Sequence, residues 1–160
     1  MDRLEALIAT IIEEDRRLRE MLAVRPVVLL DQCEAVGSMS AKEALGHLAF
    51  WDAFTVRFFE ARFADRKAEA GLADFEERDR QERRRLRAQP FTEVLGAYRE
   101  ATDGLLTFLR THWRELSERE RAELITPLRH RRHHRLLLER ALADVPARED
   151  EPPRQESGRA

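Results

Sequence analysis

Cysteine is nearly absent from this chain of 160 residues, which contains Cys33 alone. A single cysteine cannot form an intramolecular disulfide, and it excludes a zinc site built from several thiolates. Long hydrophobic runs are also lacking, since no stretch approaches the roughly 20 apolar residues of a membrane span. Residues 1–5 show no signal-peptide pattern. We therefore expect a cytoplasmic protein with no membrane association.

An excess of charge of one sign is lacking as well. Lysine and arginine together number 29 against 31 acidic residues, for a formal net charge of −2. Such a balance gives no global attraction to nucleic acid or anionic lipid. The arginine-rich runs 83–87 and 129–135 lie beside acids or histidines and match no recognition-helix motif. Nucleic-acid binding is therefore not expected.

What is present is apolar periodicity at helical spacing, interrupted where glycine and proline cluster. No segment has the alternation of a strand. This pattern predicts an all-α protein. The core helices are expected at residues 2–23, 40–65, 92–113 and 126–144.

The connections between these segments predict a four-helix bundle within residues 1–145. About 25 residues join the second and third core helices, too many for a tight hairpin, and the charged run 76–87 within them predicts a mostly solvated helix. This long, partly helical crossover permits the two helices to run parallel. Residues 24–39 are expected to form a loop, and residues 146–160 a disordered C-terminal tail.

Helix starts are marked by capping patterns. Ser40 with Glu43 and Ser117 with Glu120 have the spacing of capping boxes, in which each side chain satisfies the other's backbone N–H. The run Pro90-Phe91-Thr92 is expected to end the charged helix and to cap the third core helix. Thr126 is expected to cap the last one, with Pro127 at its first position.

Three of the five histidines lie within residues 129–135. His130 and His134 are four residues apart, so they stand on one face of a helix, and that face continues into buried leucines. His47 lies on the apolar stripe of the second core helix, beside Trp51, which is a candidate for supporting the ligands or contacting a substrate. Three inward-facing imidazoles from two helices would hold a metal ion with at least one position left open.

Two other interpretations of these histidines remain. In the first, each histidine serves the core by hydrogen bonding to a backbone carbonyl; in the second, the run 129–135 forms a basic surface. In favour of a metal, Arg131 and Arg135 disfavour the protonated imidazole and could also pair with an anionic substrate group. His133 is rotated about 100° from His134, which makes it either a supporting residue behind the ligands or an exposed one.

Two segments resemble a known family. Residues 37–51, GSMSAKEALGHLAFW, resemble the second-helix motif of the DinB-like superfamily, including its DfsB/ClbS-type branch. Residues 130–135, HRRHHR, resemble that family's H-x-x-H-H-R segment, although Met39 replaces the usual tryptophan before Ser40. The resemblance implies a four-helix bundle with a crossover, often dimeric. It also implies a divalent metal bound by His47, His130 and His134.

The resemblance further implies thiol-dependent transferase or hydrolase chemistry in some members. The leading hypothesis is therefore a metal-dependent enzyme acting on a small molecule, either a thiol or an anionic compound. Zinc or nickel is the expected metal, with manganese or iron as alternatives, and a homodimer is expected. The alternative hypothesis is a metal-free helical bundle that acts as a binding or stress-response protein.

Overall fold

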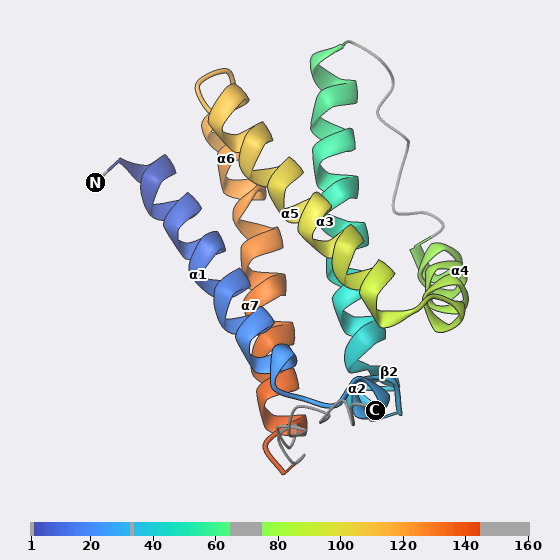
Figure 1. The fold of residues 1–160 in the computed structure, drawn as a ribbon. Helices are drawn as coiled ribbons and strands as arrows, with labels where there is room; N and C mark the ends of the chain where they lie inside the picture. Colours follow the sequence, from blue (N-terminus) through green and yellow to red (C-terminus); the bar gives the residue numbers. More distant parts are fainter. Residues whose placement is uncertain (1, 33, 65–74, 145–160) are drawn as a thin grey trace, which may run out of the picture.

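A computed structural model describes residues 2–32, 34–64 and 75–144 of the chain, and these ranges are mostly α-helical. Four long helices pack together, which confirms the expected all-α bundle (Figure 1). Their bounds agree with the sequence prediction to within a few residues. The four are α1 (Arg3–Ala23), α3 (Ala41–Phe63), α5 (Phe91–His112) and α7 (Ile125–Ala141).

The second and third long helices run in the same direction, as the length of their connection permits. In Figure 1, α3 and α5 rise side by side, whereas α1 and α7 descend. The C-terminal ends of α3 and α5 are in contact: the Phe63 ring stacks on that of His112, with centroids 5.1 Å apart. Helix α4 (Phe75–Ala88) lies within the connection, so the crossover is partly helical as expected.

The loop expected at residues 24–39 was a wrong prediction. A short helix α2 (Val27–Gln32) is followed by the strands β1 (Glu34–Val36) and β2 (Met39–Ser40), which pair antiparallel. The carbonyl of Pro26 accepts hydrogen bonds from the N–H groups of Leu29 and Leu30 and so starts α2. Leu30 is fully buried. Between the strands, Gly37 has a φ of 59°, the left-handed region that glycine adopts without steric cost.

Both capping boxes are confirmed, at Ser40 for α3 and at Ser117 for the short helix α6 (Glu118–Glu123). Pro90, which lies in the run expected to cap the third core helix, occupies the N-cap of α5. The cap expected at Thr126 is wrong, because α7 begins at Ile125 and Pro127 is its third residue. A proline is tolerated there because the first turn of a helix has no intrahelical partner for its N–H groups.

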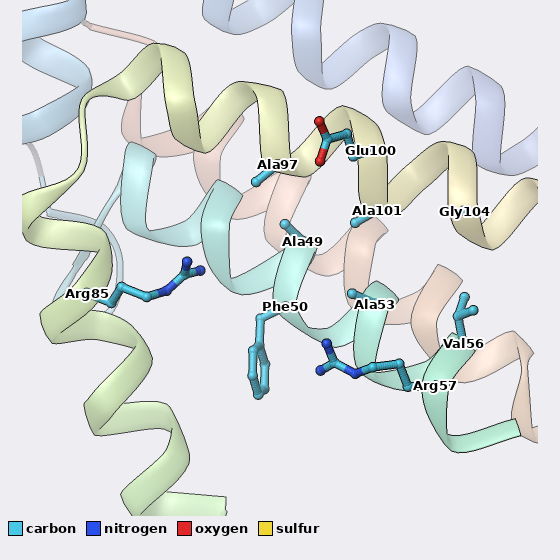
Figure 2. A pocket seen from close by; sticks show the side chains of 10 residues that line it. All are labelled: Ala49, Phe50, Ala53, Val56, Arg57, Arg85, Ala97, Glu100, Ala101 and Gly104. Carbon is cyan, nitrogen blue, oxygen red and sulfur yellow. The ribbon is translucent and has the colours of Figure 1, made fainter. Parts of the chain in front are cut away.

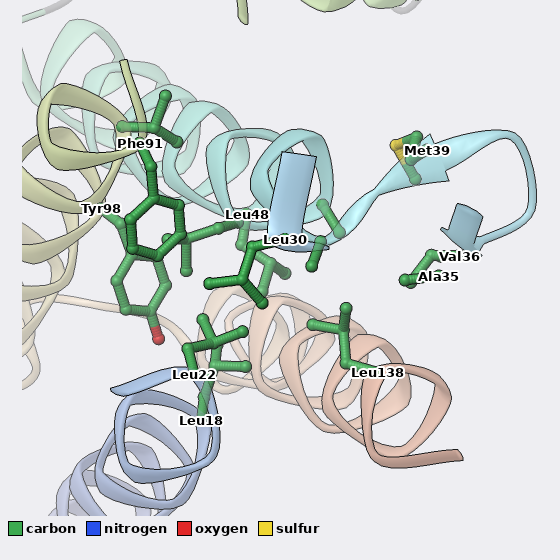
Figure 3. Close-up of a cluster of buried hydrophobic side chains, with 14 of the residues drawn as sticks. Leu18, Leu22, Leu30, Ala35, Val36, Met39, Leu48, Phe91, Tyr98 and Leu138 are labelled. Carbon is green, nitrogen blue, oxygen red and sulfur yellow. The ribbon is translucent and has the colours of Figure 1, made fainter. Parts of the chain in front are cut away.

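The core consists of two apolar clusters separated by a buried polar layer. Figure 3 shows the cluster nearer the N-terminus of α3, where side chains from the long helices meet α2 and the hairpin. It includes Leu18, Leu22, Leu30, Leu45, Leu48, Tyr98 and Leu138. The second cluster includes Leu7, Ile11, Phe59, Leu105, Phe108 and Leu109. The polar layer between them contains the buried residues Asp15, Asp52, Thr102 and Arg131.

Within the described ranges, no helix is both long enough and apolar enough to cross a membrane. Three features named from the sequence lie outside those ranges. They are Cys33, residues 65–74 of the crossover, and residues 146–160, which were expected to form the C-terminal tail.

Candidate metal centre

The structure brings His47, His130 and His134 together. The Nε2 atom of His130 lies 3.2 Å from Nε2 of His47 and 2.8 Å from Nε2 of His134. One ligand atom from each residue falls within 4.8 Å of the other two. The three imidazoles therefore form one group, contributed by α3 and α7, that could hold a metal ion.

The antiparallel arrangement of α3 and α7 places these histidines at the same depth. His47 lies six residues after the start of α3 at Ala41, and His134 lies seven residues before the end of α7 at Ala141. Because the N-terminal half of α3 lies beside the C-terminal half of α7 (Figure 1), the two positions fall at a similar depth in the bundle. The sequence left the relative direction of these two helices open.

Burial keeps all three imidazoles neutral. Desolvation, reinforced by the charges of the neighbouring histidines, lowers the pKa of His130 to about 4 and that of His134 to about 3. Burial also lowers the pKa of His47, and the nearby Asp79 carboxylate opposes that shift. Neutral imidazole is the form that coordinates metals. At pH 7 the cluster therefore holds lone pairs rather than positive charges.

The spacing of the nitrogens suits a cation. Three nitrogens bound tetrahedrally to zinc at its usual bond length lie about 3.3 Å apart. Without a cation, Nε2 of His130 carries either one hydrogen or one lone pair, so it can form a hydrogen bond with only one of its two close neighbours. A bound metal ion satisfies all three nitrogens at once, so the donor set and its geometry fit a divalent metal.

A carboxylate that the sequence analysis missed orients one of the ligands. Oδ1 of Asp79, on α4, lies 3.3 Å from Nδ1 of His47. Asp79 is itself held by Arg83, whose Nε lies 2.9 Å from Oδ2. A carboxylate at Nδ1 keeps the hydrogen on that nitrogen, so Nε2 is left free for the metal. This contact gives the crossover helix a role in the site.

Helix α4 reaches the site because it packs closely on the start of α3. A Cβ atom at Gly46 would lie only 2.1 Å from Cδ2 of Leu86, so a larger residue at this position would force the Leu86 side chain to shift. Arg87 Nε contacts Oε1 of Glu43 at 2.7 Å, and Lys42 Nζ donates to the carbonyl of Gln89 at 2.9 Å. The expectation that this segment is mostly solvated holds for its outer face, whereas Leu86 is fully buried.

The two arginines expected near a substrate lie inside the protein. Arg131 is 1% exposed and donates hydrogen bonds to Asp52, Tyr98 and Thr102. The guanidinium of Arg135 is likewise buried against two glutamates, Glu14 and Glu139. Both arginines are thus committed to partners within the bundle, and their positions do not support a role in binding an anionic substrate.

The remaining predicted residues lie at the edge of the cluster. His133 is exposed, and its ring meets that of His134 edge-on at 5.9 Å. Trp51 is half-buried one helical turn beyond His47, with ring centroids 6.1 Å apart. His133 therefore faces solvent beside the ligands, whereas Trp51 provides an apolar wall next to them.

Replacing Asp79 with asparagine is expected to weaken metal affinity by about 10–100-fold, the usual effect of removing a carboxylate behind a histidine ligand. The amide keeps the size of the side chain but can present an N–H to Nδ1, which favours the wrong tautomer of His47. Titration with zinc, followed calorimetrically, measures the change. Glu77→Gln, an exposed position on the same helix, is the matched control and should bind zinc normally; equal affinities for both variants would remove Asp79 from the site.

Comparison with known proteins identifies no relative of this chain. No family model, no curated protein and no solved structure matches the chain. The protein is thus a small helical bundle whose three-histidine cluster could bind a metal ion.

Proposed function

We propose that this protein is a divalent-metal-dependent enzyme of the DinB-like type, with the ion bound by His47, His130 and His134. One observation carries the proposal: the Nε2 atoms of three neutral imidazoles converge on a single point. The parallel pair α3 and α5, joined by a crossover, is the arrangement that the resemblance implies. The sequence motifs and the geometry of the site therefore support the same assignment.

The donor set favours particular metals. Three imidazole nitrogens suit zinc and nickel, whereas manganese binds preferentially to carboxylate and water oxygen. Asp79 is occupied with Nδ1 of His47, so it supports the ligand set rather than adding to it. We propose zinc or nickel as the resident ion, with iron or manganese as weaker alternatives.

Three protein ligands leave room for a substrate. A bound ion would lower the pKa of a thiol or a water molecule at its open position, which suits a thiol-dependent transferase or a hydrolase. His47 is kept in the binding tautomer by Asp79, and the half-buried Trp51 limits the access of water from its side. The proposed substrate is a small molecule that reacts with, or carries, a thiol.

Metal analysis tests the site directly. Protein purified without chelators is expected to contain close to one divalent ion per chain, and added zinc or nickel should raise the melting temperature of the apo-protein. Replacing His134 with alanine should abolish both effects, because two imidazoles hold an ion far more weakly than three. His133→Ala is the matched control and should retain the metal. A melting temperature blind to zinc, nickel and manganese would leave the metal-free binding protein as the better hypothesis.

Cobalt substitution tests the thiol chemistry separately. Addition of a small thiol such as cysteine to the cobalt-loaded protein is expected to produce a thiolate-to-cobalt charge-transfer absorption in the near ultraviolet. Such a band requires sulfur bound at the open position. Cobalt binding without this band would contradict the thiol-dependent activity while leaving the metal site intact.

A further inference from the structure

A cavity lies between α3 and α5, apart from the histidine cluster (Figure 2). Its volume is about 410 Å³, within the range of small-molecule sites. None of its lining residues is a candidate metal ligand. The lining residues from α3 are Ala49, Phe50, Ala53, Val56 and Arg57, and those from α5 and α4 are Ala97, Glu100, Ala101, Gly104 and Arg85.

The floor of this groove is apolar and stays open because its side chains are short. Ala49 and Ala53 on α3 face Ala101 and Gly104 on α5 across the gap. A Cβ atom built at Gly104 would meet nothing within 4 Å, so the space above this glycine is empty. The half-buried Phe50 ring forms one wall. An apolar body of modest width therefore fits between the two helices.

Positive charge lies at one side of the groove. Figure 2 shows Arg85 and Arg57 on either side of Phe50. Arg85 is paired with Glu82 at 2.9 Å, whereas Arg57 is exposed and forms no ion pair or hydrogen bond with any residue in the described ranges. Its guanidinium is therefore available to an anion from solution. The opposite side, on α5, carries the carboxylate of Glu100.

We propose that this groove binds an amphipathic monocarboxylate, with an alkyl or aryl body on the floor and the carboxylate at Arg57. Guanidinium groups bind carboxylates through paired, charge-assisted hydrogen bonds, which orients such a ligand. The apolar floor supplies the contact for the body of the ligand, because burying apolar surface is favourable. A helix from a second molecule of this protein fits less well, since it would bury Arg57 without a specific carboxylate to pair with it.

Decanoate is a suitable probe for the full-length protein, with decanol as its neutral counterpart. Calorimetric titration is expected to show one saturable decanoate site and at least tenfold weaker binding of decanol. Arg57→Gln should weaken decanoate binding about tenfold, equivalent to the loss of one charge-assisted interaction. Glu100→Gln should leave affinity unchanged or increase it, because it removes a like charge from the opposite side.

Two glycines on α5 offer a matched pair of variants that should preserve the fold. Gly104→Leu fills the groove and is expected to abolish decanoate binding. Gly96→Leu places the same side chain on the same helix outside the groove, where a Cβ also meets nothing within 4 Å, and binding should be retained. Both substitutions remove a glycine from a helix interior, which favours the helix, so unfolding does not confuse the comparison.

Four results would overturn the proposal. Equal binding of decanoate and decanol, or equal binding by the Gly104→Leu and Gly96→Leu variants, would show that the groove is not a carboxylate site. Weaker decanoate binding by Glu100→Gln would contradict the proposal, because removal of a like charge cannot weaken the binding of an anion at Arg57. A dimer in sedimentation that Gly104→Leu converts to a monomer, without decanoate binding to either, would assign the groove to a second copy.

Discussion

Replacing Arg131 with methionine is expected to destabilise the protein by about 3–5 kcal/mol, because a buried carboxylate is then left without its cation. Arg131 joins three helices: it donates to Asp52 on α3 and to Tyr98 and Thr102 on α5, the last at 3.1 Å. Methionine keeps much of the apolar volume, so the decrease in the free energy of unfolding measures the contribution of the charge and the hydrogen bonds. Chemical denaturation measured at pH 7.5 gives the change.

The matched control is Arg132→Met, an exposed neighbour on α7, whose cost should stay within about 0.5 kcal/mol. Adding Asp52→Leu to Arg131→Met should recover much of the lost stability, since an apolar pair leaves no charge unpaired. If Arg131→Met costs no more than Arg132→Met, the network is energetically neutral and only the apolar clusters hold the bundle together.

The pH dependence of the Arg131→Met variant gives a further check. Burial already raises the pKa of Asp52 to about 6, although the Arg131 guanidinium opposes this shift. Without the guanidinium this pKa must rise further. A carboxyl group whose pKa is raised in the folded state makes the protein less stable as pH rises. The loss of stability caused by Arg131→Met should therefore be smaller at pH 5.5 than at pH 8.

The sequence was sufficient to predict the three-histidine cluster because the signal for its members is local. The spacing of His130 and His134 depends only on helical geometry, and the capping box at Ser40 fixes where α3 begins. His47 then follows on the apolar stripe of α3. Whether His47 lies beside His130 and His134 depends on the relative direction of α3 and α7. That direction is set by the tertiary fold, and no local sequence pattern encodes it.

The residues that sequence reasoning misjudged are charged side chains with partners distant in the chain. Arg131 and Arg135 looked available to a substrate because arginine is rarely buried, yet acidic residues on other helices enclose both. Asp79 lies in a run of charges without apolar periodicity, so no pattern marked it directly. An indirect signal was present, because Leu86 is an isolated apolar residue in that run and packs against Gly46 within α3.

Acid is expected to destabilise the metal-free protein through the histidine cluster. In the unfolded chain each imidazole has a pKa near 6.5, whereas burial lowers it to about 4 at His130 and about 3 at His134. Between these values the unfolded chain binds more protons than the folded one, so stability falls as pH drops below about 6.5. The opposite shift at Asp52 cancels only part of this effect, because it concerns one proton against those of several histidines.

Bound metal should make this dependence steeper. A ligand that binds only the folded state adds about 2.7 kcal/mol when its free concentration is 100 times the dissociation constant. That increment should be complete near pH 7.5, and it should disappear in acid, where protons compete for the Nε2 atoms of the cluster. The folded-state pKa values of about 4 and about 3 place the competition at His130 and His134 lower than the ordinary histidine range.

Thermal melts from pH 8 to pH 3, with EDTA or with excess zinc, separate the two effects. The zinc-bound protein should melt higher throughout the neutral range, and the two curves should converge in acid. His133→Ala should behave like the unmodified protein, because its ring is exposed. His134→Ala should show no zinc increment at any pH and a flatter response to acid, since the imidazole with the lowest pKa is gone. If the EDTA and zinc curves coincide from pH 8 downward, the histidines serve packing alone and the proposed metal centre is wrong.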